Sequence, residues 1–115
     1  VGERMLHQQV LQTATTWASS EQMMFVVGAT HPEELGEIRK MLPDYFLLVP
    51  GVGAQGGDLQ AVAHNGLNDE CGLLVNSSRG IIYASNGSDF ATRAGEEARK
   101  LQEQMSVLLK EKGLV

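Results

Sequence analysis

Four glycines lie within seven residues, at positions 51, 53, 56 and 57, directly after a short apolar run that stops at Pro50. Glycine lacks a Cβ, so a loop of this kind can turn its backbone N–H groups inward around an anion, and phosphate is the usual ligand. An ordinary turn does not need so many glycines, because each one costs conformational entropy on folding. The spacing therefore indicates a phosphate-binding loop at the end of a strand.

Two familiar nucleotide motifs fit this loop poorly. Residues 51–56 satisfy the G-x-G-x-x-G pattern of dinucleotide-binding folds, but that fingerprint needs an acidic residue about 20 positions further on to bind the ribose hydroxyls. Position 76 is Asn. A P-loop is excluded because Gly57 and Asp58 stand where Lys and Ser or Thr are required.

A second polar segment follows the next apolar run. Residues 77–80 read Ser-Ser-Arg-Gly, and Arg79 carries a guanidinium that can bind phosphate oxygens through two parallel hydrogen bonds. In (β/α)8 barrels, phosphate is often bound by the loops after the last two strands together with the first turn of a short extra helix. We therefore expect the glycine loop and the Arg79 loop to share one phosphate.

Hydrophobic periodicity predicts the elements that position these loops. Helical spacing predicts helices at residues 6–20, 30–42, 59–66 and 89–112, and all-apolar runs predict strands at residues 23–29, 45–49 and 72–75. Thr30 is the expected N-cap of the second helix, and Met23 and Met24 are expected in the core. The residues between 76 and 86 are expected to form a loop.

One leading helix followed by three strand–helix units indicates an α/β fold with a parallel sheet. Three parallel strands make a poor complete domain, and a (β/α)8 barrel typically needs about 250 residues. We therefore expect residues 1–115 to be a single segment, the C-terminal part of a TIM barrel that carries its phosphate-binding loops.

Composition excludes several classes of function. The net charge of −5 and the scattered basic residues argue against a nucleic-acid partner. Cys71 is the only cysteine, which excludes a disulfide framework or a cysteine-built zinc site within the chain. No apolar run approaches the roughly 20 residues of a membrane span. The chain is thus expected to be cytoplasmic, without a membrane partner and without a metal; His31 and His64 are expected to be solvated or to favour helix ends.

Three segments resemble one known family: VVGATHPEEL at residues 26–35, PGVGAQGGD at 50–58 and NSSRGIIYA at 76–84. They are similar to orotidine 5′-phosphate decarboxylase, the barrel enzyme that converts orotidine 5′-phosphate to UMP. The resemblance covers nearly the whole chain and implies the sixth, seventh and eighth strand–helix units of the barrel, preceded by the helix after the fifth strand.

The resemblance also implies a set of substrate-binding residues. Gln55 would bridge the substrate phosphate and the pyrimidine, Arg79 would bind the phosphate, and the backbone around Ser78 would complete the cradle. Pro50 and Val52 would lie along the base and ribose. The full implied set is Pro50, Gly51, Val52, Gly53, Gln55, Gly56, Ser78, Arg79 and Gly80.

The family's acid–base chemistry is missing from the chain. It rests on an Asp-x-Lys-x-x-Asp set on an earlier strand, and none of Lys40, Lys100, Lys110 and Lys112 has an aspartate two residues before it. The resemblance thus implies a cofactor-free carbon–carbon lyase in which this chain supplies the phosphate-binding half, with no catalytic residue of its own. The implied partners are the substrate, the N-terminal part of the barrel and a second copy in a homodimer.

Two other readings stay open. The chain could be a non-catalytic half-barrel that binds phosphate or a nucleotide, or part of another phosphate-binding barrel enzyme, such as a sugar-phosphate epimerase or synthase. Gln55 within the glycine loop favours the decarboxylase. An Asp-x-Lys-x-x-Asp sequence upstream would support it and exclude the half-barrel.

Overall fold

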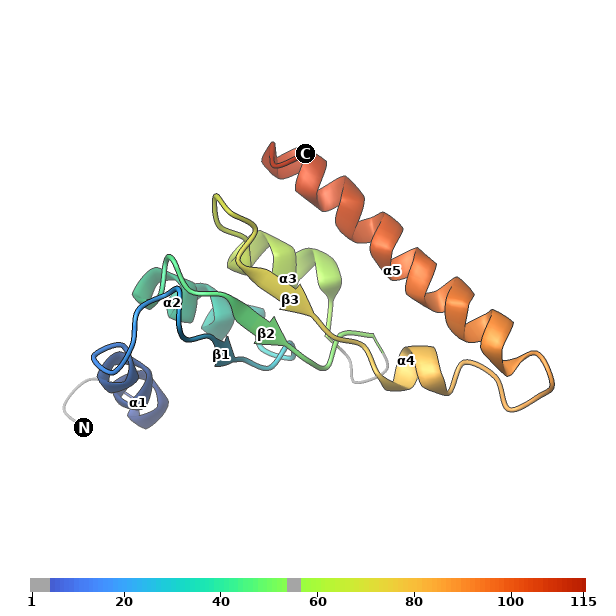
Figure 1. Cartoon of the computed structure of the whole chain (residues 1–115), viewed down its shortest axis with the longest axis horizontal. Helices are drawn as coiled ribbons and strands as arrows, with labels where there is room; N and C mark the ends of the chain where they lie inside the picture. Colours follow the sequence, from blue (N-terminus) through green and yellow to red (C-terminus); the bar gives the residue numbers. More distant parts are fainter. Residues whose placement is uncertain (1–4, 54–56) are drawn as a thin grey trace.

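The computed structural model describes residues 5–53 and 57–115 and contains three strands and five helices in this part of the chain (Figure 1). In chain order they are α1 (Leu6–Ala14), β1 (Phe25–Val26), α2 (Pro32–Met41), β2 (Leu47–Val49), α3 (Leu59–Gly66), β3 (Leu73–Val75), α4 (Arg79–Ile82) and α5 (Phe90–Lys112). The predicted order of a leading helix and three strand–helix units is confirmed. The one addition is α4, a single turn within the segment predicted as a loop.

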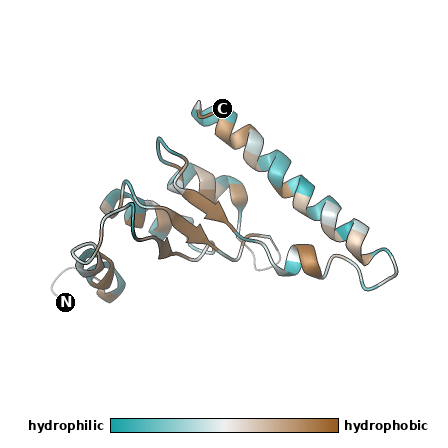
Figure 2. Cartoon of the chain, viewed as in Figure 1, coloured by the Kyte–Doolittle hydropathy of each residue, from teal (hydrophilic) through white to brown (hydrophobic). Residues whose placement is uncertain are grey.

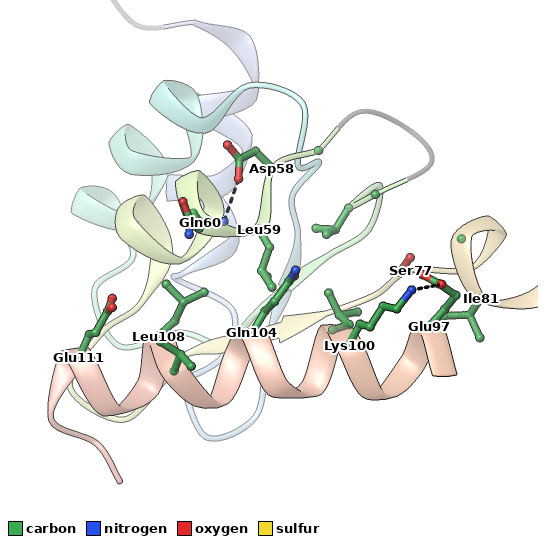
Figure 3. Close-up of a pocket in the computed structure, with 16 residues that line it drawn as sticks. Asp58, Leu59, Gln60, Ser77, Ile81, Glu97, Lys100, Gln104, Leu108 and Glu111 are labelled. Atoms are coloured by element: carbon green, nitrogen blue, oxygen red, sulfur yellow. Dashed lines mark hydrogen bonds and ion pairs between the residues drawn. The ribbon is translucent and has the colours of Figure 1, made fainter. Parts of the chain in front are cut away.

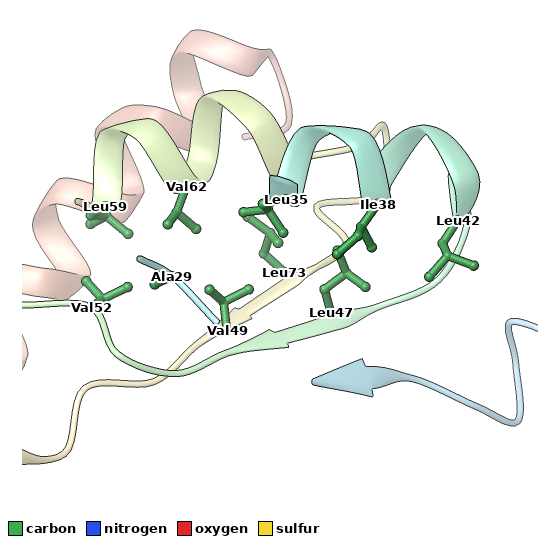
Figure 4. Close-up of a cluster of buried hydrophobic side chains, with 10 residues drawn as sticks. All are labelled: Ala29, Leu35, Ile38, Leu42, Leu47, Val49, Val52, Leu59, Val62 and Leu73. Atoms are coloured by element: carbon green, nitrogen blue, oxygen red, sulfur yellow. The ribbon is translucent and has the colours of Figure 1, made fainter. Parts of the chain in front are cut away.

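The three strands form one parallel sheet in the order β1-β2-β3. Leu47 and Val49 of β2 point toward α2 and α3, whose apolar stripes close over them (Figure 4). Parallel strands are joined by crossover helices, so each helix that connects two strands can pack its apolar side against the sheet. The core cluster consists of Ala29, Leu35, Ile38, Leu42, Leu47, Val49, Val52, Leu59, Val62 and Leu73.

The opposite face of the sheet lacks a helical cover in the described residues. Val26, Leu48 and Leu74 are register partners across the three strands, so their side chains share this face. Val26 is 67% exposed and Leu74 is 50% exposed. Uninterrupted apolar runs such as residues 23–29 are typical of strands buried on both faces, but in the described residues the core contacts lie on the helical side of the sheet only. Met24, expected in the core, is also exposed.

Two helix boundaries differ from the sequence prediction. α1 ends at Ala14 and not near residues 19–20, and the hydroxyls of Thr15 and Thr16 hydrogen-bond to carbonyls three residues back, which competes with further helix. α2 starts with His31 as N-cap, not Thr30. Pro32 explains this shift, because proline favours the first helical position and so fixes the cap one residue before it.

α5 lies at one end of the molecule and packs loosely. Its 23 residues lie between the N-cap Asp89 and Gly113, whose φ of 84° ends the helix. Polar and apolar residues alternate along the length of the helix (Figure 2). None of its residues is fully buried. The radius of gyration is 15.8 Å, against about 13 Å for a compact domain of this length. Within residues 5–53 and 57–115, no helix has the length and hydropathy of a membrane span.

Candidate functional site

The glycine loop follows β2 and folds back on itself. Gly51 and Gly53 have φ angles of 91° and 85°, a region that residues with a side chain rarely adopt. The N–H of Gly53 donates to the carbonyl of Gly57 over 3.0 Å, and the N–H of Gly57 donates to the carbonyl of Gly51 over 2.9 Å. Gln55 and Gly56 lie outside the described residues.

Gly57 is buried where three segments meet. A Cβ at this position would lie 2.5 Å from the carbonyl oxygen of Gly51 and 2.6 Å from the Cβ of Ala29, both closer than real contacts allow. The N–H of Ala29 also donates to the carbonyl of Pro50. The segment after β1 is therefore packed against the glycine loop. At Gly51 and Gly53 the φ angle favours glycine, and at Gly57 the close packing does, whether or not a ligand binds.

The Arg79 loop follows β3 and leads directly into α4. The N–H of Asn76 donates to the carbonyl of Val49 over 3.0 Å, which joins the end of β3 to the end of β2. Ser78 is the N-cap residue of α4, and Arg79 and Gly80 form its first turn. The first N–H groups of a helix have no intrahelical acceptor, so this turn presents backbone donors.

The structure brings the two loops together. An ideal Cβ at Gly53 would lie 3.4 Å from Oγ of Ser77. Residues of both loops line one cavity of about 740 Å³, with the start of α3 on one side and α5 on the other (Figure 3). From the loops its lining residues are Val52, Gly53, Gly57, Ser77 and Gly80. The expected meeting of the two strand-end loops is thus present in the fold.

Four charged side chains line this cavity, Asp58, Glu97, Lys100 and Glu111, and among the described residues only Glu97 and Lys100 form an ion pair with each other. Asp58 caps α3, accepting from the N–H of Gln60 over 2.9 Å. Glu97 of α5 is paired with Lys100 at 2.7 Å, and this hydrogen bond holds the pKa of the Glu97 carboxyl below its usual value. Glu111 comes from the last turn of α5, at the opposite end of the cavity from Ser77 (Figure 3).

The predicted site residues that the structure describes fall into three groups. Val52, Gly53 and Gly80 line the cavity. Pro50 and Gly51 form the base of the glycine loop, while Ser78 and Arg79 lie at the start of α4 outside the lining, with the Arg79 side chain exposed. Among the described residues Arg79 forms no ion pair, so its guanidinium is available to a ligand.

Several lining residues were missed by the sequence analysis. Asp58 carried a readable signal, since an aspartate directly before a helical pattern is a typical N-cap. Ser77 was treated only as part of a polar loop. Lys100 and Gln104 gave no signal, because their place on the wall depends on how α5 packs.

The two histidines considered in the sequence, His31 and His64, are both exposed. His31 caps α2 without a side-chain hydrogen bond, and His64 lies in the last turn of α3. In residues 5–53 and 57–115, no three His, Cys, Asp or Glu side chains are grouped closely enough to hold a metal ion.

Comparison with known proteins agrees with this geometry. No family model matches the chain. An orotidine 5′-phosphate decarboxylase of Flavobacterium johnsoniae is 56% identical over 107 residues, which are 93% of this chain and 39% of that protein. One from Parabacteroides distasonis is 54% identical over 114 residues, covering 99% of this chain and 40% of that protein. The chain is homologous to the orotidine 5′-phosphate decarboxylases. It corresponds to a C-terminal part of them and spans about 40% of the length of these curated relatives.

Solved structures agree with the family and the fold. The Leishmania donovani UMP synthase superposes with a TM-score of 0.71 at 38% identity, covering 89% of this chain and 23% of that one. The Leishmania donovani OMP decarboxylase gives a TM-score of 0.68 at 34% identity, covering 90% of this chain and 40% of that one. The predicted fold class, a C-terminal portion of a TIM barrel, is confirmed.

Proposed function

We propose that the full-length protein carrying this segment decarboxylates orotidine 5′-phosphate to UMP and CO2, and that residues 1–115 form the segment of the barrel that binds the substrate phosphate. The observation that supports this most directly is the meeting of the glycine loop and the Ser77 loop at one end of a cavity, in a chain 56% identical to a decarboxylase.

In this proposal the chain's residues bind and orient the substrate. Arg79 and the first N–H groups of α4 bind the phosphate, and Gln55 bridges phosphate and pyrimidine. Pro50, Val52 and the backbone of Gly51, Gly53, Gly56 and Gly80 line the rest of the substrate. Binding energy from a phosphate that takes no part in the chemistry can still lower the barrier, by holding the reacting ring in place.

The bond-breaking chemistry requires residues that this chain lacks. Loss of CO2 leaves an electron pair on the ring carbon, and an acid has to protonate that carbon. Every lysine of the chain lies in α2 or α5, and none belongs to the Asp-x-Lys-x-x-Asp set that the family resemblance implies. We propose that this set comes from the N-terminal part of the barrel and that no cofactor is needed.

The uncovered face of the sheet supports the proposal that further strands, from the N-terminal part of the barrel, complete the site. Val26, Leu48 and Leu74 are in register on it, and inward-pointing aliphatic side chains of this kind fill the interior of a (β/α)8 barrel in layers. We propose that the remaining strands close against this face. We further propose that the complete enzyme is a cytoplasmic homodimer.

The test is an assay of the full-length protein with orotidine 5′-phosphate, following loss of substrate absorbance and formation of UMP. Turnover supports the proposal. Tight UMP binding without turnover would favour the non-catalytic half-barrel, and turnover of a sugar phosphate alone would favour an epimerase or synthase. A protein that neither binds UMP nor acts on orotidine 5′-phosphate would refute the proposal.

A further inference from the structure

Ser77 lies at the junction of the two loops and is fixed from both sides. The preceding residue, Asn76, is held to β2 by the hydrogen bond to the carbonyl of Val49, and α4 begins two residues later at Arg79. Ser77 is half-buried and lines the cavity, with its hydroxyl at the side where Gly53 approaches (Figure 3). The backbone at Ser77 is thus positioned by the end of β3 on one side and the start of α4 on the other.

The two consecutive serines of this loop differ in their partners. Oγ of Ser78 accepts a hydrogen bond from Nδ2 of Asn76 at 3.4 Å, and Ser78 is exposed and outside the cavity lining. Oγ of Ser77 makes no hydrogen bond with another described residue. A serine hydroxyl has one donor and two acceptor sites, and none of the Ser77 sites is used by a described residue.

Gly53 keeps space around that hydroxyl. Its φ of 85° disfavours any side chain, and even a methyl group there would stand at van der Waals contact with Oγ of Ser77. Of the carboxylates that line the cavity, Asp58 accepts from the N–H of Gln60, Glu97 is paired with Lys100, and Glu111 comes from the last turn of α5. A phosphate between the two loops would be a strong acceptor for the Ser77 hydroxyl.

We propose that the Ser77 hydroxyl donates a hydrogen bond to the phosphate of the bound nucleotide, as a third group beside Arg79 and the backbone donors of α4. This inference rests on the proposed function and adds a residue that the sequence analysis did not place in the site. A hydroxyl bound to a phosphate oxygen makes a short, charge-assisted hydrogen bond, stronger than one between neutral groups.

The test is calorimetric titration of the full-length protein with UMP and with uridine. Ser77→Ala should raise the Kd for UMP by about tenfold or more, because hydrogen bonds to charged groups are the strong ones, and should leave the Kd for uridine unchanged. Ser77→Thr keeps the donor and should bind UMP like the parent. Ser106→Ala is the matched control, since Ser106 is a half-buried serine of α5 outside the cavity lining; both of its Kd values should equal those of the parent.

The outcomes separate this inference from the proposed function. If the parent binds UMP and Ser77→Ala binds it equally well, the inference fails and the proposed function stands. Equal losses for UMP and uridine, or a Ser77→Thr variant as weak as Ser77→Ala, would mean that Ser77 shapes the loop and does not bind phosphate. A parent that neither binds UMP nor acts on orotidine 5′-phosphate would overturn both.

Discussion

Nη2 of Arg39 donates to the carbonyl of Gly72 over 2.8 Å, which joins α2 to the residue directly before β3. The same guanidinium donates to the carbonyls of Gly66, Leu42 and Tyr45 at 2.7, 2.9 and 2.6 Å. One buried side chain thus holds the end of α3, the end of α2 and the starts of β2 and β3 together. These contacts lie at the amino-terminal end of the strands, opposite the two loops of the candidate site.

Burial lowers the pKa of the Arg39 guanidinium, while the nearby Cys71 and Asp44 raise it. Arginine is so strongly basic that the side chain keeps its charge throughout the neutral range despite this lowering. Its four acceptors are backbone carbonyls, and a fork of five N–H donors suits such an arrangement better than a lysine ammonium with three.

Arg39→Ala should destabilise the full-length protein by about 3 kcal/mol, because it removes the guanidinium donor from four partly or fully buried carbonyls, of which that of Gly72 keeps another donor, the N–H of Leu47. Urea unfolding measures this as a lower midpoint. Arg39→Lys should recover only part of the loss. Arg99→Ala, at an exposed position of α5, is the control and should leave the midpoint nearly unchanged. Equal effects of Arg39→Ala and Arg99→Ala would contradict a stabilising role of the Arg39 hydrogen bonds.

Gly57→Ala tests the packing of the glycine loop. The new methyl group would collide with Gly51 and Ala29, so the loop has to shift, at a cost typical of overpacking of about 1 to 3 kcal/mol. Affinity for UMP should fall with it, as measured by calorimetry. Gly95→Ala is the matched control, since nothing lies within 4 Å of a Cβ there.

The Gly95→Ala control has its own expected direction. Gly95 lies within α5, where alanine is favoured over glycine by roughly 0.5 to 1 kcal/mol. The substitution should raise the thermal midpoint slightly and leave UMP affinity unchanged. A Gly57→Ala variant that behaved in the same way would refute the close approach of the three segments.

Much of this fold could be predicted because its signals are local. The apolar runs located all three strands, and the spacing of Leu35, Ile38 and Leu42 located the buried side of α2. The meeting of the loops followed from topology, since the carboxyl ends of neighbouring parallel strands lie at one edge. The glycine pattern was read as a sign of a ligand, whereas the structure also gives it a backbone reason at Gly51, Gly53 and Gly57.

Other features depend on contacts that no local pattern encodes. Arg39 reads as one more surface charge on a helix, because its acceptors lie up to 33 residues away in the chain. The exposure of Val26 and Leu74 could not be predicted from strands that look fully buried. These strands have the composition of a barrel interior, and the described residues cover only one of their faces.

The 115-residue chain, prepared alone, should form no UMP from orotidine 5′-phosphate. It lacks the general acid, and acid–base catalysis typically contributes about 10²-fold to 10⁴-fold. It should also self-associate, because Val26 and Leu74 are exposed on the uncovered face and β1 and β3 have unpaired edges. Light scattering checks this, and Leu74→Lys should reduce the association. A monodisperse, active monomer would contradict both expectations.

Arg79 gives the most direct test of the phosphate site. If its guanidinium binds the phosphate in the full-length enzyme, Arg79→Ala removes a charge-assisted contact worth about 1.5 to 3 kcal/mol, a loss of about tenfold to 150-fold in kcat/KM. The loss should depend on the phosphate. Orotidine, which lacks that group, should be turned over almost equally well by Arg79→Ala and the parent, whereas Gln55→Ala should weaken contacts to both phosphate and base.

Arg93→Ala is the control for charge, because Arg93 is an exposed arginine of α5 paired only with Glu96 of the same helix among the described residues. It should leave kcat/KM for both substrates unchanged. Steady-state kinetics of the parent and the three variants on orotidine 5′-phosphate and orotidine decide the matter. Since Arg79 starts α4 and its side chain is exposed, equal fractional losses with and without phosphate would mean that it stabilises the first turn of that helix and does not bind the ligand.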